Sequence, residues 1–468
     1  MLALAAAAAP LAAVLLALLL GRSSLTSALA GVAVVVPLIL LAFPTPLADV
    51  ARTGADWIPV VTEVILVLAG GILFAEAGRF TGNQREITEW VTRSLGTGIV
   101  PVLAIVHGFT PLTESLTGYG VGAALAVPLV LGLGLSGKKS AIIGLLGLCA
   151  VPWGSMGPGT LIASHITGVD FDVLGVTTAI FNVVVFAAVG VTAALLVSAP
   201  DARLTNVLGA LGSALALSAF VLGANLLIGT APAGAIGGLL TLALHIAIRA
   251  ARGHTVRVTR AVVRAFAPYG VVLCGMLAAT VGVALAAAAA TPAAAVLTSP
   301  AFWLFVAAGL LFATRRGFFR GALAAALGTW VRVAPATVLF IVLGALMGVS
   351  GMSEELAGQL ARLGSAYLFL LPLVAALVGF LTGSNSGANA LAAGAQANVA
   401  VALGADLPLA LGAHNAAGSA AMMASPARVE LATRLARVPE ERGSVQRLLL
   451  LQLGAIAVVV GGLCLAIV

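Results

Sequence analysis

Long apolar runs recur from one end of this 468-residue chain to the other, and they constrain its fold more than any motif does. Each run is about 18 residues or longer, which is enough for a helix to cross the roughly 30 Å hydrocarbon layer of a membrane. Charged residues make up only 8% of the sequence, too few to cover the surface of a water-soluble protein. The runs do not alternate between apolar and polar residues, which argues against a membrane β-barrel. The sequence therefore predicts an all-α polytopic membrane protein.

The apolar runs predict about twelve transmembrane helices within a single domain that comprises residues 1–468. The first run lacks the basic segment with which a signal peptide begins, so we interpret it as the first transmembrane helix. The expected spans lie near residues 2–20, 25–44, 57–78, 140–163, 172–199, 204–229, 232–250, 265–290, 300–314, 333–350, 364–383 and 447–468.

The net charge of +7 does not indicate binding to nucleic acid. The basic residues gather in short loops between apolar runs, most clearly in RAARGHTVRVTRAVVR at residues 249–264. This is the distribution that the positive-inside rule gives for cytoplasmic loops. The three cysteines are scattered without the spacing of a metal site or a disulfide framework, so we expect no metal and no cofactor.

Two regions, near residues 97–136 and 384–426, fit poorly as regular spans because glycine, proline and polar residues interrupt them. Each region is expected to form a re-entrant hairpin or a pair of broken helices. An exposed backbone group in lipid costs several kcal/mol, so such breaks survive where protein or a water-filled cavity covers them. Paired interruptions in the two halves of a transporter chain are the best sequence indication of its binding site.

The second region begins with TGSNSGANALAAGAQANVA, at residues 382–400. Asn385, Asn389 and Gln396 are spaced to share one face of a helix. Ser384 or Asn385 is expected to cap the N-terminus of that helix, where free N–H groups and a partial positive charge favour an anion. We interpret the cluster as a site for a small carboxylate. The alternative is that these residues only bond neighbouring helices together.

The first region contains HGFTPLTESLTGYGVGAALAVPLVLG, at residues 107–132. Glu114 is an ionisable residue between apolar runs, where the default interpretation is functional. His107 lies seven residues earlier, and imidazole titrates near neutral pH. Gly118 and Gly120 allow unusual backbone angles. The alternatives are that Glu114 lies at an aqueous mouth or pairs with an arginine.

A third polar stretch, AHNAAGSAAMMASP at residues 413–426, supplies Asn415 and Ser425 as further cavity-lining residues. The sequence GVSG at residues 348–351 looks like the nucleophile turn of intramembrane serine proteases, but it ends a helix and has no histidine nearby in the sequence. A hydrolase needs a base within hydrogen-bond reach of its nucleophile. We therefore expect no catalytic residues, and an intramembrane hydrolase is a remote alternative.

Four blocks of this sequence resemble the L-lactate permease family of bacterial lactate and glycolate transporters. They are TESLTGYGVGAALAVPLVLGLG, GLCAVPWGSMGPGT, TGSNSGANALAAGAQANVAVALG and HNAAGSAAMMASP. The resemblance implies a secondary transporter of a small monocarboxylate such as lactate or glycolate, driven by proton symport, in the bacterial cytoplasmic (inner) membrane. It also implies that the broken segments meet near the middle of the membrane, with two pseudo-symmetric halves as one arrangement.

The resemblance assigns roles to residues of both broken regions. Glu114, with His107, would carry the proton. The substrate-binding residues would be Gly118, Tyr119, Gly120, Ser384, Asn385, Ser386, Asn389, Gln396, Asn415 and Ser425. The chain departs from the family pattern at Asn385, where an aspartate is expected, and at Met422, where a lysine is expected. We interpret the two changes as the joint loss of a buried acid–base pair, which leaves neither charge unpaired.

These departures leave alternatives for the substrate and the coupling ion. A Na⁺-coupled or uncoupled transporter of another small organic anion is the main alternative, because the carbonyl groups freed by broken helices also suit Na⁺. The expected partners are a small organic carboxylate and the lipid bilayer, without nucleic acid, and a homo-oligomer remains an open alternative.

Overall fold

The computed structural model describes residues 2–96, 98–253, 255–286, 291–314 and 316–468. Every regular element within these residues is a helix. Ten of the described helices are long and apolar enough to cross a membrane, and two bent helix pairs raise the number to as many as twelve. These observations confirm the prediction of an all-α polytopic membrane protein. Residues 287–290, at the end of the expected span 265–290, lie outside the described residues.

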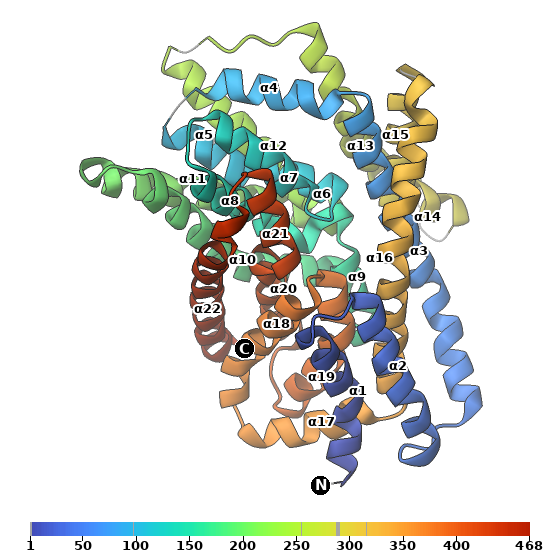
Figure 1. The fold of residues 1–468 in the computed structure, drawn as a ribbon. Helices are drawn as coiled ribbons and strands as arrows, with labels where there is room; N and C mark the ends of the chain where they lie inside the picture. Colours follow the sequence, from blue (N-terminus) through green and yellow to red (C-terminus); the bar gives the residue numbers. More distant parts are fainter. Residues whose placement is uncertain (1, 97, 254, 287–290, 315) are drawn as a thin grey trace.

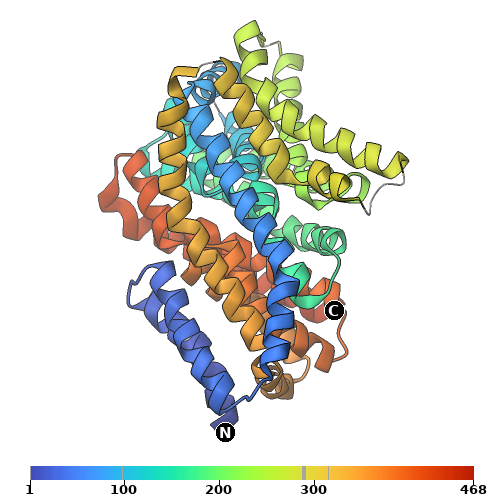
Figure 2. The same ribbon diagram turned by 90° about the vertical axis from the view of Figure 1, so that its right-hand side faces the viewer.

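The N-terminal helices pack beside a long helix from the second half of the chain. α1 and α2 form an antiparallel pair, and α3 runs alongside α16 (Figure 2). Both α2 and α3 contact α16. The bounds of these helices are α1 Leu2–Leu19, α2 Ser24–Leu41, α3 Leu47–Phe80 and α16 Phe319–Val349.

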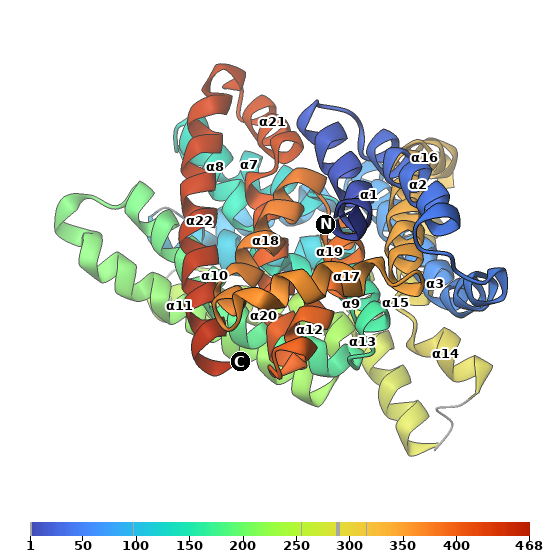
Figure 3. The same cartoon turned by 90° about the horizontal axis from the view of Figure 1, so that it is seen from below.

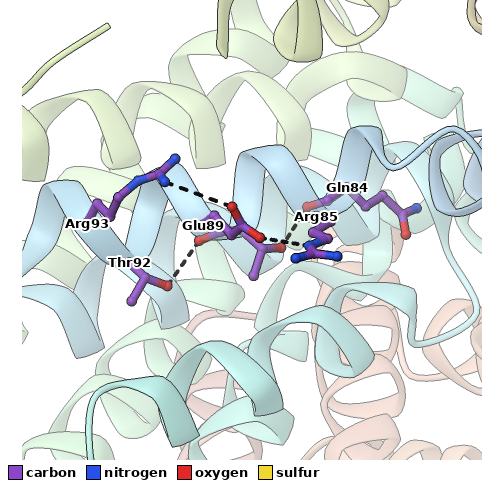
Figure 4. Close-up of polar contacts among 6 residues, drawn as sticks. Gln84, Arg85, Glu89, Thr92 and Arg93 are labelled. Carbon is purple, nitrogen blue, oxygen red and sulfur yellow. Dashed lines mark hydrogen bonds and ion pairs between the residues drawn. The ribbon is translucent and has the colours of Figure 1, made fainter. Parts of the chain in front are cut away.

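α4 (Asn83–Leu95) lies across one end of the molecule (Figure 1) and was not expected from the apolar runs. It buries Ile87, Trp90 and Val91 on one face. The opposite face carries Arg85, Glu89 and Arg93, which form ion pairs along the helix (Figure 4). The hydrogen bond from Arg85 holds the pKa of the exposed Glu89 carboxyl below its ordinary value. A helix with such a charged face covers the protein without crossing the membrane.

The first broken region forms a buried helical segment followed by two further helices. The segment comprises α5, a π-helical turn at Ala104–Phe109 and α6, and a break separates it from α7. A long helix, α10, closes this unit. The helix bounds are α5 Ile99–Leu103, α6 Thr110–Thr117, α7 Val121–Gly132, α8 Gly137–Leu146, α9 Pro158–Thr167 and α10 Phe171–Val197.

The prediction of one regular span at residues 140–163 was wrong. α8 leads into a 3-10 segment (Leu148–Met156) with a bend of 49°, and the chain breaks again before α9. Ala150, Gly154 and Ser155 have non-helical backbone angles. The cause is local, because Pro152 and the glycines around it interrupt a run that is otherwise apolar enough to span.

The second broken region repeats this order of elements: a helix, a break, two helices, a second break, a short helix and a long one. The turn between α18 and α19 begins with Leu381, Thr382 and Gly383, and the turn between α6 and α7 begins with the same three residue types. Breaks therefore occur in both regions where the sequence predicted them, and they occupy equivalent places in two related units. The second unit consists of α18 Ala366–Thr382, α19 Asn385–Ala402, α20 Leu407–Ala420, α21 Pro426–Leu435 and α22 Arg442–Ile467.

The helices between the two units lie around them. Seen from below (Figure 3), the helices of the second unit occupy the middle, with α11 on one side and α2, α3 and α16 on the other. α14 and α15 form the second bent pair, at an angle of 59°. The remaining bounds are α11 Arg203–Leu227, α12 Thr230–Ala251, α13 Arg260–Leu285, α14 Pro292–Thr298, α15 Pro300–Thr314 and α17 Met352–Leu360.

Candidate functional site

A cavity of about 210 Å³ lies where the break between α6 and α7 meets the break between α18 and α19. Residues of α16 and of the 3-10 segment before α9 complete its wall. Six of the residues predicted from sequence line it: Glu114, Gly118, Tyr119, Ser384, Asn385 and Ser386. The other six do not line it: His107, Gly120, Asn389, Gln396, Asn415 and Ser425. Both broken regions thus contribute to a single cavity.

The first break consists of three successive residues in the left-handed region. Gly118, Tyr119 and Gly120 have φ angles of 69°, 58° and 81°. A residue with a side chain seldom adopts a positive φ, so Tyr119 is held there by its surroundings. A Cβ atom at Gly118 would lie 2.7 Å from the Cβ atom of Ser155, so the turn packs directly on the 3-10 segment. The break is a fixed feature that presents Tyr119 to the cavity.

The carboxylate of Glu114 stabilises this break. Its Oε1 atom accepts a hydrogen bond from the Gly120 N–H at 2.8 Å, and its Oε2 atom accepts one from the Gly122 N–H at 3.0 Å. The side chain is only 3% exposed. Glu114 therefore satisfies two backbone donors that the break would otherwise leave unpaired at the start of α7.

The second break ends at the N-terminus of α19. Ser384 caps this helix by accepting a hydrogen bond from the Gly387 N–H at 3.1 Å, as the sequence predicted. Asn385 and Ser386 follow in the first turn and line the cavity. The partial positive charge of the helix N-terminus is therefore directed at the cavity together with amide and hydroxyl groups.

Three asparagines form a buried network beside the cavity. Asn389 Nδ2 donates to Asn415 Oδ1 at 3.0 Å and to Asn385 Oδ1 at 3.2 Å. Asn415 Nδ2 donates to Thr160 Oγ1 on α9 at 2.9 Å and to Thr178 Oγ1 on α10 at 3.1 Å. Asn415 thereby links the second unit to the first. Its contacts match the alternative in which polar residues bond helices together.

Gln396 and Ser425 belong to the same unit and do not line the cavity. Gln396 accepts a hydrogen bond from the Tyr367 hydroxyl at 3.0 Å and donates to the Leu371 carbonyl at 3.3 Å, which ties α19 to α18. Ser425 precedes α21, and its buried hydroxyl has no hydrogen-bond partner among the described residues. Gln396 therefore serves helix packing in this conformation.

Arg428 on α21 lines the cavity and was not among the predicted site residues. Its guanidinium packs against Gly120, where a Cβ atom would lie 1.9 Å from Nη1. Within the described part of the chain Arg428 has no acidic partner, and its buried Nε atom has no hydrogen-bond partner. Two other arginines of this basic stretch, Arg434 and Arg442, pair with Glu430. Its position in the sequence could have indicated a site residue, because Arg428 follows the break at Ser425 by one helical turn.

Arg332 on α16 also lines the cavity, although its side chain is largely exposed. The formal charges that line the cavity, two arginines and one glutamate, therefore sum to +1. Val151, Ala336 and Phe340 provide an apolar part of the wall. A cavity with this charge and mixed lining suits a small anion that carries a short apolar group.

Comparison with known proteins gives one family model and several relatives that match part of this chain. The family model described as L-lactate permease matches residues 278–467. A putative L-lactate permease of Haemophilus influenzae is 27% identical over 107 residues, which is 23% of this chain and 20% of that protein. The L-lactate permeases of Salmonella typhi and Salmonella typhimurium are each 40% identical over 83 residues, which is 18% of this chain and 15% of each relative. The aligned segments thus span a fifth or less of these relatives.

Proposed function

We propose that this chain, which belongs to the L-lactate permease family through residues 278–467, is a secondary transporter of a small monocarboxylate such as lactate. The observation that carries the proposal is the guanidinium of Arg428, which has no acidic partner among the described residues and lines a cavity between two chain breaks. Broken helices that meet around a cavity are the arrangement in which transporters bind substrate at the middle of the membrane. The proposed membrane is the bacterial inner membrane.

The chemistry of the cavity supports a monoanion of the size of lactate. Binding sites for drug-sized ligands usually measure roughly 300–1,000 Å³, so the smaller cavity here favours a shorter molecule. The carboxylate would pair with Arg428 and the N-terminus of α19. The substrate hydroxyl would bond to Asn385 or Ser386, and its methyl group would contact Phe340. The net formal charge of the lining offsets one negative charge.

Proton symport is the proposed mode of coupling, with Glu114 and His107 as the proton-carrying residues. Glu114 is suited to this role because it reaches both the cavity and the backbone of the break. Loss of its negative charge would weaken two hydrogen bonds to backbone N–H groups. Protonation of Glu114 would thereby alter the turn that supports Tyr119 and Arg428.

The test is uptake of labelled L-lactate by liposomes that contain the purified full chain, with an inward proton gradient. Accumulation that an ionophore abolishes supports proton symport. Uptake that depends on Na⁺ at fixed pH, or that ignores both ions, supports the Na⁺-coupled or uncoupled alternative. Uptake no greater than in protein-free liposomes contradicts lactate as the substrate, and competition with other short carboxylates then defines the anion.

A further inference from the structure

Two buried histidines are joined through one serine at a distance from the cavity. His107 lies in the π-helical turn before α6, Ser213 on α11 and His245 on α12. Ser213 Oγ is 2.8 Å from His107 Nδ1 and 3.2 Å from His245 Nε2. All three side chains are buried, and none of them lines the cavity.

The outer nitrogen of each imidazole must carry a hydrogen. His107 Nε2 is 3.0 Å from the Phe186 carbonyl oxygen, and His245 Nδ1 is 2.8 Å from the Thr241 carbonyl oxygen. A carbonyl oxygen only accepts hydrogen bonds, so each of these nitrogens donates. In a neutral imidazole one nitrogen donates and the other accepts. The inner nitrogens of His107 and His245 therefore both present lone pairs to Ser213.

The network consequently lacks one hydrogen. The Ser213 hydroxyl has a single hydrogen and can donate to only one of the two facing nitrogens. The other contact then brings two lone pairs together, which is unfavourable for buried groups. One additional proton removes the conflict, because a protonated His245 donates to Ser213 while Ser213 donates to His107. The mirror arrangement, with the proton on His107, is equally complete.

We propose that His107, Ser213 and His245 form a binding site for a single proton, shared between the two imidazoles through the serine hydroxyl. Transfer from one ring to the other needs no further reactant. The ring that gains the proton from the hydroxyl becomes the imidazolium, while the hydroxyl regains a proton from the other ring, which becomes neutral.

The surroundings of the network determine how firmly it holds the proton. Within the described residues neither imidazole bonds to an acidic side chain: each contacts Ser213 and one backbone carbonyl, and Arg249 follows His245 by one turn of α12. On the packed helices, Glu114 is bound to Gly120 and Gly122, and Asp172 accepts from the Thr230 N–H. Burial without an acidic partner opposes the charged form, while the hydrogen-bond pattern favours it. Such a balance suits a proton that must be both bound and released.

The position of the network connects the proton to the broken segment. His107 belongs to the first unit, whereas Ser213 and His245 belong to helices outside both units. A Cβ atom at Gly190 of α10 would lie 2.6 Å from His107 Cε1, so the ring is tightly enclosed. π-helical turns are frequent at functional sites. The bound proton therefore strengthens the attachment of the segment that ends at Tyr119. Its use in transport rests on the proposed function.

The proton site can be tested without any assumption about the substrate. The full chain, labelled with ¹⁵N-histidine in lipid nanodiscs, is titrated by NMR over the range of about pH 5–8 in which imidazole ordinarily changes charge. His107→Gln and His245→Gln assign the two rings. We expect both rings to respond together to the uptake of one proton, and Ser213→Ala to abolish this joint response. Rings that both remain neutral throughout, or that titrate independently, would overturn the proposal.

A transport measurement then tests coupling. In liposomes, His245→Gln is expected to lose gradient-driven accumulation of L-lactate while it retains exchange of labelled for unlabelled lactate. His165→Gln, a histidine outside the network, is the matched control and keeps both. Equal loss of both activities in His245→Gln would indicate a purely structural role and overturn the coupling step. If the wild-type protein shows the shared titration but transports no lactate, that result contradicts lactate as the substrate and supports the proton site.

Discussion

At the scale of single residues, the net charge of the cavity depends on which charged side chains line it and which have been replaced. Asn385 and Met422, the two positions at which the chain departs from the family pattern, both line the cavity. Their proximity fits the interpretation that an acid and a base were replaced together. Arg428 remains as a cation without an acidic partner within the described residues. An arginine in this state is available to a carboxylate ligand.

Replacement of Arg428 tests this availability. Arg428→Gln is expected to weaken lactate binding by at least about tenfold, since a hydrogen bond to a charged group contributes roughly 1.5–3 kcal/mol. Arg428→Lys keeps the charge without the forked geometry and is expected to bind with intermediate affinity. Isothermal titration calorimetry of the purified protein measures both. Arg434→Gln, which removes only an exposed ion pair, is the control, and unchanged affinity in Arg428→Gln would contradict the assignment.

Replacement of Glu114 has two expected effects. Glu114→Gln is expected to abolish proton-driven accumulation while some exchange remains, because the amide cannot bind and release a proton. It should also lower the thermal unfolding midpoint, since the amide NH₂ group cannot accept from a backbone N–H and a lost charged hydrogen bond costs roughly 1.5–3 kcal/mol. Liposome uptake and a thermal scan in detergent measure the two effects. Full uphill uptake by Glu114→Gln would exclude the proton role.

At the scale of elements, the sequence predicted the breaks better than the helices between them. Gly118, Gly120 and the polar run after Thr382 signalled both interruptions. The cap was expected at Ser384 or Asn385, because a cap side chain acts on the adjacent backbone, and the structure has Ser384. Local chemistry decides such features. Residues 140–163 were predicted as one span although glycine and proline interrupt residues 149–160, because the run as a whole is apolar enough to cross a membrane and hydropathy does not register a bend.

Other elements could not be recognised because their cause lies in tertiary contacts. α4 has too few apolar residues to resemble a span, and its position is defined by the packing of one face on α3, α7, α12 and α13. Arg428 resembled the loop arginines that follow it, and its lack of an acidic partner is visible only in three dimensions. The link from His107 to Ser213 and His245 joins positions more than a hundred residues apart, so no spacing rule could indicate it.

The two break glycines provide a matched comparison. Gly118→Ala is expected to destabilise the protein more than Gly383→Ala. Both residues have positive φ, which costs a side chain roughly 1–2 kcal/mol. A Cβ atom at position 118 would also lie 2.7 Å from Ser155 Cβ, whereas at position 383 the nearest atom, Ser425 Cβ, is 3.8 Å away. Thermal unfolding of the two variants in the same detergent measures the difference. Equal unfolding midpoints would show that Ser155 moves aside without any loss of stability.

At the scale of the whole molecule, two units with the same order of elements pack against each other, with α10 of the first unit on α20 of the second. α9 of the first unit packs on α19 of the second, and α21 of the second packs on α7 of the first. Each unit thus contributes a short helix to the break of the other. The cavity is formed only when both units are in place, which explains why neither broken region alone accounts for the site.

Asn415 is a buried polar link between these units, and its removal is expected to affect both of them. Asn415→Ala leaves Asn385, Asn389 and two threonines without this shared partner. We expect lower stability by about 1–3 kcal/mol and reduced transport, because buried polar groups without partners are costly. Thermal unfolding and liposome uptake measure these changes. Asn206→Ala, which removes a half-buried contact to Ser198, is the control, and equal effects of both substitutions would contradict a linking role.

The Leu-Thr-Gly turn occurs at the equivalent break of both units, and its two copies have different surroundings. In the first copy the turn continues with Tyr119 and Gly120, and Glu114 precedes it to hold the backbone. In the second copy the turn continues with Ser384 and Asn385, and Gly379 stands where the glutamate would be, close against the backbone of Gly418. Both copies line the cavity, but a carboxylate holds the backbone of the first turn and a helix N-terminus follows the second. Each copy therefore serves as the natural reference for the other when the turn residues are exchanged between them.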